Sequence, residues 1–246
     1  MYFTEPQPTP FDLNFSVLGI PVRVSPWFWL GSLIFGYSYT GGEARNLFLW
    51  EIAVFVSILV HEMGHAVMIR QFGEYPRVVL LFLGGLAIGS GGRSSREQIA
   101  ISAAGPIAQV LLAILVIALV RLTGHEFSGW IPFWNDQWFD LHGRELPEMP
   151  YLGLNTFLEY LVVPSILWAV LNLAPVFPLD GGQITRAILF LWNPRDGIRQ
   201  SLLVSVIAGA ALALYGFNIR DSYLGMMFAL LAFNSFQTYQ GVRNRW

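Results

Sequence analysis

Two histidines and a glutamate form the part of this 246-residue sequence that most plainly offers chemistry. His61 and His65 stand four residues apart, and Glu62 directly follows the first of them. On a helix, residues i and i+4 share one face, so the two imidazoles can bind one metal ion with Glu62 beside it as a candidate general base. The spacing therefore predicts a catalytic Zn²⁺ site that includes His61 and His65 as ligands.

The setting of this motif indicates a membrane. The motif lies in an apolar run from Leu47 to Ile69, which is long enough to cross a bilayer. The whole chain is 54% hydrophobic and 12% charged, whereas soluble domains carry about a quarter charged residues. Net charge is −2 and no basic run is present, which argues against nucleic-acid binding. There is no cysteine, so disulfides and thiolate metal sites are excluded.

We predict an all-α polytopic membrane protein with about six transmembrane helices. The third begins with a capping box, either Ser94 with Glu97 or Ser95 with Gln98, and contains Pro106, which is expected to kink it. A short helix, 183–192, is expected before the last two spans. The six expected spans cover about residues 26–39, 46–70, 94–120, 154–171, 198–217 and 223–239.

Two short β elements are also expected. Residues 15–24 read as a hairpin at the membrane edge. In 76–92, two apolar runs flank Gly84-Gly85, which is typical of a hairpin and too short for a spanning helix. We expect this second hairpin to be re-entrant, because backbone at membrane depth is tolerated where protein or a water-filled cavity satisfies it. The alternative is an ordinary loop whose apolar residues dip into the interface.

The distribution of arginines predicts an orientation. With six spans, ten arginines fall on the side of the N-terminus and four on the other, which puts both termini and the mouth of the site in the cytoplasm. Residues 121–150 form an extramembrane loop on the opposite side, where His125 and His142 are expected to be ordinary loop histidines. We expect one domain over 1–246, with a catalytic core at about 15–192, further spans at about 198–240 and no appended soluble domain.

A third zinc ligand is needed, because catalytic zinc takes three protein ligands and keeps one position open. Asp180 is the outstanding carboxylate: it lies in Pro-Leu-Asp-Gly-Gly beside a span, on the same side of the membrane as the histidines. Its segment, 172–182, would have to be irregular backbone inside the protein. The alternative for Asp180 is a cap on the following helix. Glu51, near the far end of the same span as the histidines, reads as an interfacial carboxylate.

Together these residues resemble the site-2 protease family of intramembrane zinc metalloproteases. The resemblance rests on the pentad His61–His65, the later segment Asn172–Gly181, the Gly-Gly hairpin and Gly105-Pro106. It implies zinc bound by His61, His65 and Asp180, with Glu62 as base, Asn172 stabilising the oxyanion, and the re-entrant hairpin, including Gly84, Gly85 and Leu86, holding substrate in extended form. The family often has an asparagine where Gln109 stands, three residues after the proline, and Gln109 is counted among the substrate-binding residues.

The predicted function is intramembrane zinc endopeptidase activity on transmembrane segments of single-span membrane proteins, that is, regulated intramembrane proteolysis in a lipid bilayer. A catalytically silent membrane scaffold of the same fold is the first alternative, although a silent relative would usually have lost Glu62 or a ligand. A metal transporter is the second, although the spans show neither inverted repeats nor a polar path across. A compact chain without accessory domains favours a prokaryotic inner membrane; the sequence specifies neither the natural substrate nor the oligomeric state.

Overall fold

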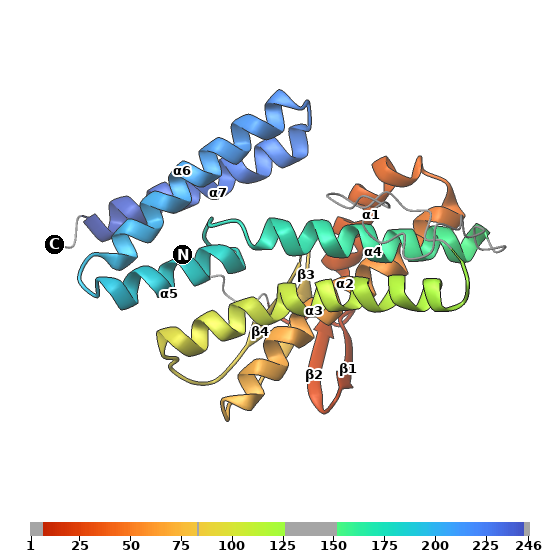
Figure 1. The fold of residues 1–246 in the computed structure, drawn as a ribbon, viewed down its shortest axis with the longest axis horizontal. Helices are drawn as coiled ribbons and strands as arrows, with labels where there is room; N and C mark the ends of the chain where they lie inside the picture. Colours follow the sequence, from red (N-terminus) through yellow and green to blue (C-terminus); the bar gives the residue numbers. More distant parts are fainter. Residues whose placement is uncertain (1–6, 83, 126–151, 244–246) are drawn as a thin grey trace. The chain divides into compact units, whose positions relative to one another are not determined.

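The computed structural model describes residues 7–82, 84–125 and 152–243 and is mostly helical (Figure 1). The helices fall close to the predicted ranges, and the Ser94–Glu97 capping box is present: the Ser94 amide donates to Glu97 Oε2 (2.7 Å) and the Glu97 amide to Ser94 Oγ (3.3 Å). In chain order the elements are β1 (Leu13–Val17), β2 (Ile20–Val24), α1 (Pro26–Thr40), α2 (Ala44–Gln71), β3 (Arg77–Leu81), β4 (Gly84–Ile88), α3 (Ser95–Leu122), α4 (Leu152–Asn172), α5 (Asp180–Trp192), α6 (Gly197–Asn218) and α7 (Ser222–Arg243).

The chain divides into two compact units, each of which is described by itself. The histidine unit comprises Glu5–Ser90 and Ile107–Ala169, and it carries the His61–His65 pentad. The aspartate unit comprises Gly91–Pro106 and Val170–Trp246, and it carries Asp180. The single catalytic domain expected from the sequence stays a prediction.

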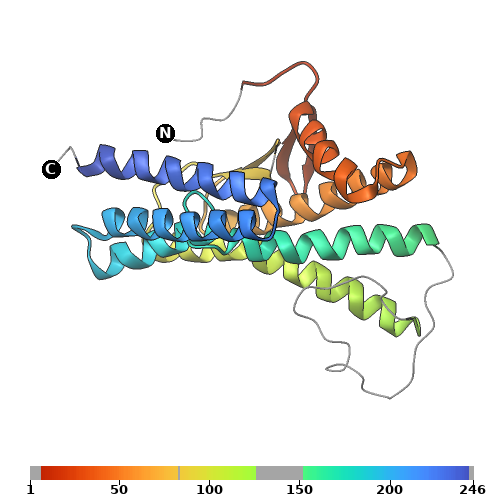
Figure 2. The same ribbon diagram turned by 90° about the horizontal axis from the view of Figure 1, so that it is seen from above.

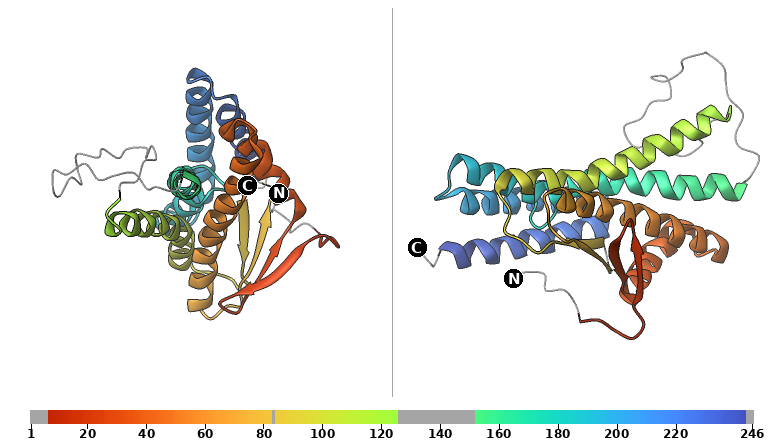
Figure 3. Two further views of the ribbon diagram at one scale, coloured as in Figure 1. Left: turned by 90° about the vertical axis from the view of Figure 1, so that its right-hand side faces the viewer. Right: turned by 90° about the horizontal axis from the view of Figure 1, so that it is seen from below.

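Both expected hairpins form, and they join into one sheet of the order β1-β2-β3-β4 (Figure 3). The join is a parallel pairing of Val22–Val24 with Val78–Leu80, which the sequence analysis did not foresee. The predicted position of Gly84 and Gly85 at the turn of the second hairpin was wrong. They begin β4, where they pair with Leu81 and Leu80, instead of forming the turn. The sheet therefore ends in β4, whose outer edge has no neighbouring strand among the described residues.

The inner face of this sheet packs on α1 and α2. Alternate residues of β2 are buried, as expected for a strand with one covered face, whereas three consecutive residues of β3, Val78–Leu80, are buried. Val24 of β2 and Leu80 of β3 are both fully buried in one core cluster. They meet Ile58, Met63 and Ala66 of α2, so the pentad helix and the sheet share a core. Nearer the N-terminal end of α2, Trp50 and Ala53 pack against Tyr160 and Leu161 of α4. The helix that carries the histidines is thus supported along its length.

In the aspartate unit, α6 and α7 form an antiparallel hairpin (Figure 2). Small residues allow the two helices to approach closely: a Cβ at Gly209 would lie 3.0 Å from Cβ of Ala232. Helix α5 packs against α6, and the segment 173–179 connects α4 to α5.

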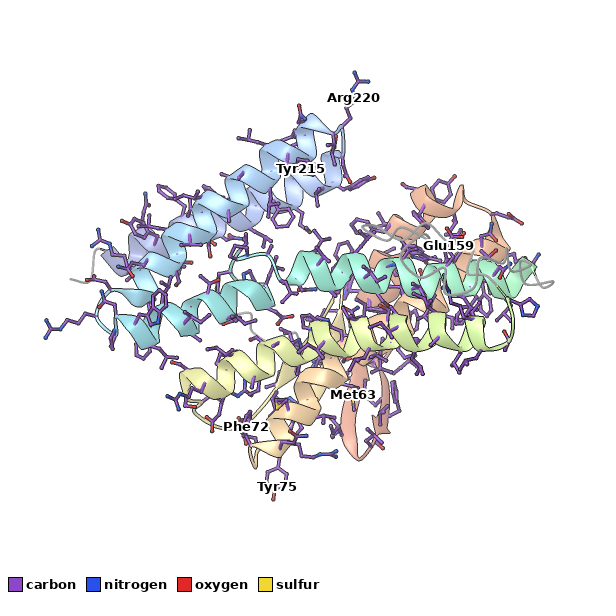
Figure 4. The ribbon with its side chains drawn as sticks, in the orientation of Figure 1. Met63, Phe72, Tyr75, Glu159, Tyr215 and Arg220 are labelled. Carbon is purple, nitrogen blue, oxygen red and sulfur yellow. The ribbon has the colours of Figure 1, made fainter. Side chains whose placement is uncertain are left out.

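Four described helices are long and apolar enough to cross a membrane, namely α2, α3, α4 and α6. Helix α1 has 15 residues, about 22 Å at the standard rise, against a hydrocarbon core of about 30 Å. At the end of α2, Tyr75 is 89% exposed and reaches away from the helix (Figure 4). The chain is an integral membrane protein, while six spans and a re-entrant hairpin stay predictions.

Candidate metal centre

The two histidines of the pentad face one another on α2. His61 is 2% exposed and His65 is 7% exposed, and their Nε2 atoms lie 3.0 Å apart. The rings meet edge to face with centroids 4.7 Å apart. This convergence follows from the i, i+4 spacing, because a regular helix stacks such residues on one face. Two ring nitrogens directed at one point are what a shared metal ion requires.

Gln109 of α3 indicates which nitrogen of His61 carries the proton. Its Oε1 lies 2.8 Å from His61 Nδ1, and its Nε2 donates to Ser57 Oγ at 2.9 Å. Because the amide nitrogen is engaged by Ser57, the oxygen faces the imidazole and accepts a hydrogen bond from Nδ1–H. The lone pair of His61 then resides on Nε2, the atom directed at His65. A metal-ligating histidine ordinarily has such a partner on its other nitrogen.

Two serines extend this network. Ser165 of α4 donates to Ser57 Oγ at 2.8 Å, and both side chains are essentially inaccessible to solvent. Gln109 is also fully buried, so the chain Ser165–Ser57–Gln109–His61 crosses three helices without contact with water. A buried network in which each amide and hydroxyl has a partner holds its members in one arrangement.

Glu62, 4% exposed, lies against the first residues of β4. A Cβ atom added to Gly85 would overlap the Cγ and Cδ atoms of Glu62, so only a glycine leaves room for the carboxylate. The neighbouring Gly84 has a φ of 151°, and a Cβ there would contact the Trp168 ring at 3.5 Å. Leu86 follows on the same strand, paired with Val79. Three of the four residues assigned to substrate binding therefore lie on the strand next to the candidate base, and the fourth, Gln109, lies on α3.

Asp180 and Asn172 lie in the aspartate unit, at the two ends of the connection between α4 and α5. Asn172 is the last residue of α4 and Asp180 the first of α5. The helix cap is Leu179, which makes no side-chain capping bond, so Asp180 is not the N-cap that the alternative interpretation required. The predicted irregular backbone between them is confirmed over 173–179. Helix α5 begins three residues earlier than predicted.

Of the two remaining histidines, only His125 lies among the described residues. His125 Nδ1 lies 3.2 Å from its neighbour Thr123 Oγ1, as expected for a loop residue. His142 and most of the loop predicted over 121–150 lie outside the described residues. The sequence analysis missed Ser57 and Ser165. A signal for Ser57 was present, since Ser57, His61 and His65 recur every four residues and share one helical face.

The donor set fits zinc. Imidazole nitrogen and carboxylate oxygen are both zinc ligands; the histidine unit offers the first through His61 and His65, and the aspartate unit offers the second through Asp180. The Nδ1 partner of His61 adds the outer contact that such sites usually carry. The fold and these residues together are those of a membrane protein with a His-Glu-x-x-His metal-binding motif, the motif typical of zinc metalloproteases.

Comparison with known proteins agrees with this class. The model of peptidase family M50 matches residues 50–215, and the chain belongs to that family. A zinc metalloprotease of Methanocaldococcus jannaschii is 27% identical over 226 residues, which is 89% of this chain and 54% of the relative. The stage IV sporulation protein FB of Bacillus subtilis is 24% identical over 90% of this chain and 67% of its own length.

A solved structure, the site-2 protease from Methanocaldococcus jannaschii, has the same fold. It aligns with a TM-score of 0.56 and 24% identity, over 92% of this chain and 94% of that one. The chain spans about half the length of the first curated relatives it matches. The resemblance to the site-2 proteases and the zinc cofactor predicted from the sequence are confirmed.

Proposed function

We propose that this protein is an intramembrane zinc endopeptidase that cleaves peptide bonds in or near the transmembrane segments of single-span membrane proteins. The observation that carries the proposal is the arrangement in the histidine unit. Two imidazole Nε2 atoms converge 3.0 Å apart, and the Glu62 carboxylate lies directly against Gly85 of the edge strand β4. A scaffold would need none of these features, and a transporter would not need a base beside a strand.

In this proposal His61, His65 and Asp180 hold the zinc ion. When bound, zinc supplies a water molecule acidified towards neutral pH and a Lewis acid for the scissile carbonyl. Gln109 keeps the His61 proton on Nδ1, which leaves Nε2 as the ligand atom. Asp180, in the first turn of α5, also benefits from the helix dipole, which favours a carboxylate at that end.

Glu62 moves the proton. Its carboxylate accepts a proton from the water that attacks the scissile carbonyl carbon, and it then donates that proton to the leaving amine nitrogen. The side-chain amide of Asn172 donates a hydrogen bond to the carbonyl oxygen as negative charge develops there. Burial of Glu62 limits its access to bulk water, so the proton it holds goes to the substrate.

The open edge of β4 is the proposed substrate platform. A transmembrane helix hides its peptide bonds, so a substrate must unwind locally before cleavage. Backbone groups of Gly84–Leu86 offer an unwound segment main-chain partners by β-augmentation. Gly85 would bring that segment next to Glu62, because no Cβ separates the strand from the carboxylate. Gln109 is fully buried and bonded to His61, which supports a role in holding the ligand.

The proposed location is a prokaryotic inner membrane, with both termini and the mouth of the site in the cytoplasm. The support is the excess of arginine on one side of the six expected spans. Reporter fusions at the end of α7 and in the loop after α3 test this orientation, which requires opposite sides for the two.

The experiment that tests the function is incubation of the purified, zinc-loaded protein with candidate single-span substrates. Wild type should release defined fragments, and Glu62→Gln should be slower by about 10²–10⁴-fold while it retains its zinc. Equal cleavage by the two proteins would refute the enzyme proposal. Absence of zinc after purification in metal-replete medium would do the same.

A further inference from the structure

The connection between α4 and α5 is tied to the C-terminal hairpin through the backbone of a single residue, Phe177. The Phe177 amide donates to Ser205 Oγ of α6 at 2.9 Å, and Ser235 Oγ of α7 donates to the Phe177 carbonyl at 3.2 Å. Both serines are 1% exposed. Two helices therefore bind the donor and the acceptor of one residue, which lies three positions before Asp180.

Apolar packing reinforces the same attachment. Val176, fully buried, packs against Ala213 of α6 and Phe228 of α7. The segment thus packs one side chain against the two helices and bonds the backbone N–H and carbonyl of the next residue to them. Within 173–179 only a few short-range backbone bonds are made, such as Leu179 N–H to the Val176 carbonyl at 2.9 Å. The hairpin therefore supplies constraints that the segment does not supply for itself.

The start of α5 is fixed against the same segment. A Cβ at Gly181 would overlap the Leu173 carbonyl, and one at Gly182 would overlap the backbone of Val176 and Phe177. In addition, the Arg186 guanidinium lies over the Phe177 ring, 5.6 Å from its centroid. A shift of Phe177 would consequently move the first turn of α5, which begins with Asp180.

We propose that Ser205 and Ser235 are positioning residues for Asp180, and that the α6–α7 hairpin, although it contributes no expected ligand, is required for zinc affinity. The inference rests on the proposed role of Asp180 as third ligand. Loss of the two hydroxyls would leave the Phe177 N–H and the Phe177 carbonyl without these two partners. The segment 173–179 would then be freer to move. Outer contacts that orient a ligand typically change metal affinity by about 10–100-fold.

Ser201 provides the matched control. It lies one turn before Ser205 on the same face of α6, it is 3% exposed, and its hydroxyl donates to the Ile198 carbonyl of its own helix at 2.7 Å. Ser201→Ala therefore removes an equally buried hydroxyl without releasing the segment. A general effect of deleting a buried serine would be the same in both variants.

The test compares full-length Ser205→Ala/Ser235→Ala, Ser201→Ala and Asp180→Ala in detergent. The zinc dissociation constant is measured by chelator competition, the Co²⁺-loaded visible spectrum reports ligand geometry, and thermal melting reports folding. The double variant should bind zinc at least about 10-fold more weakly and give an altered Co²⁺ spectrum, whereas Ser201→Ala should stay within about twofold of wild type.

The outcomes are distinguishable. If Asp180→Ala loses zinc but the double variant binds as tightly as Ser201→Ala, the positioning role is wrong and the proposed function stands. If Asp180→Ala keeps its zinc, the ligand assignment fails and this inference fails with it. If the double variant does not fold, the single variant Ser205→Ala is compared with Ser201→Ala. Ser205→Thr, which keeps the hydroxyl, should restore the zinc affinity. Equal zinc affinity of Ser205→Ala and Ser201→Ala would overturn the proposal.

Discussion

His61 and His65 lie one turn apart on the regular helix α2, whereas Asp180 follows a connection that is neither helix nor strand. The histidines obtain their mutual geometry from the helix itself, and the bonds from Gln109 refine it. The aspartate, in the proposal above, obtains its geometry through Phe177, whose backbone bonds serines 28 and 58 residues farther along the chain. The proposed metal site thus combines two ligands positioned by local structure with one positioned by distant packing.

The two kinds of positioning fail differently. A change on α2 acts on a ligand or on its direct partner, and the helix persists because its backbone bonds do not depend on the side chain. A change in the α6 or α7 residues that contact the segment 173–179 acts on Asp180 indirectly, through Phe177, and leaves the Asp180 side chain itself intact. Substitutions in each region should therefore separate loss of a ligand from loss of its position.

The largest effect is expected from removing a histidine. His61→Ala should weaken zinc binding by at least about 100-fold, because catalytic zinc takes three protein ligands and the variant retains only His65 and Asp180. His125→Ala, in the turn after α3, is the matched control and should bind zinc as wild type does. Metal analysis after dialysis checks this. Equal zinc content in the two variants would show that His61 is not a zinc ligand.

A strong effect on catalysis alone is expected at Gly85. A methyl group there must displace the Glu62 carboxylate, so Gly85→Ala should lower the cleavage rate by about 10²-fold or more. Zinc content should not change, since the histidines are untouched. Gly92→Ala, where the added atom meets open space, serves as control. Cleavage by Gly85→Ala at the wild-type rate would mean that Glu62 does not need its observed position.

An intermediate effect is expected from the bond to His61. Gln109→Leu removes the acceptor for Nδ1–H and should weaken zinc binding by about 10–100-fold. Gln98→Leu, earlier on α3 and bonded to Ser102 of its own helix, is the control. Chelator competition measures both. If Gln109→Leu keeps wild-type affinity, α2 alone positions His61, and the contrast with the distant positioning of Asp180 is greater.

The smallest effect is expected at Ser57, one step farther from the ligand. Ser57→Ala removes an acceptor for Gln109 and for Ser165, at a cost of about 1 kcal/mol in stability. Zinc affinity should fall by only a few fold, because the Gln109–His61 bond remains. Ser102→Ala is the control. Thermal melting with chelator competition checks it, and a loss as large as that of Gln109→Leu would show that the network acts as one unit.

The sequence predicted what depends on local spacing. The i, i+4 histidines, the Ser94–Glu97 capping box and the breaking of the helix by prolines after Asn172 all follow from rules that operate within a few residues. It did not predict the parallel pairing of β2 with β3, or the contacts of Ser57, Ser165, Ser205 and Ser235. Each of these joins residues far apart in the chain, and a serine in an apolar helix carries no sign of its partner.

The measurement that tests the central claim most directly is the zinc stoichiometry of Asp180→Ala. Asp196→Ala, an exposed aspartate that makes no side-chain capping bond at the start of α6, is measured beside it. We predict about one zinc per chain for wild type and for Asp196→Ala, and most of the zinc lost from folded Asp180→Ala. Full zinc content in Asp180→Ala would contradict the account, because the two regions would then not share one metal.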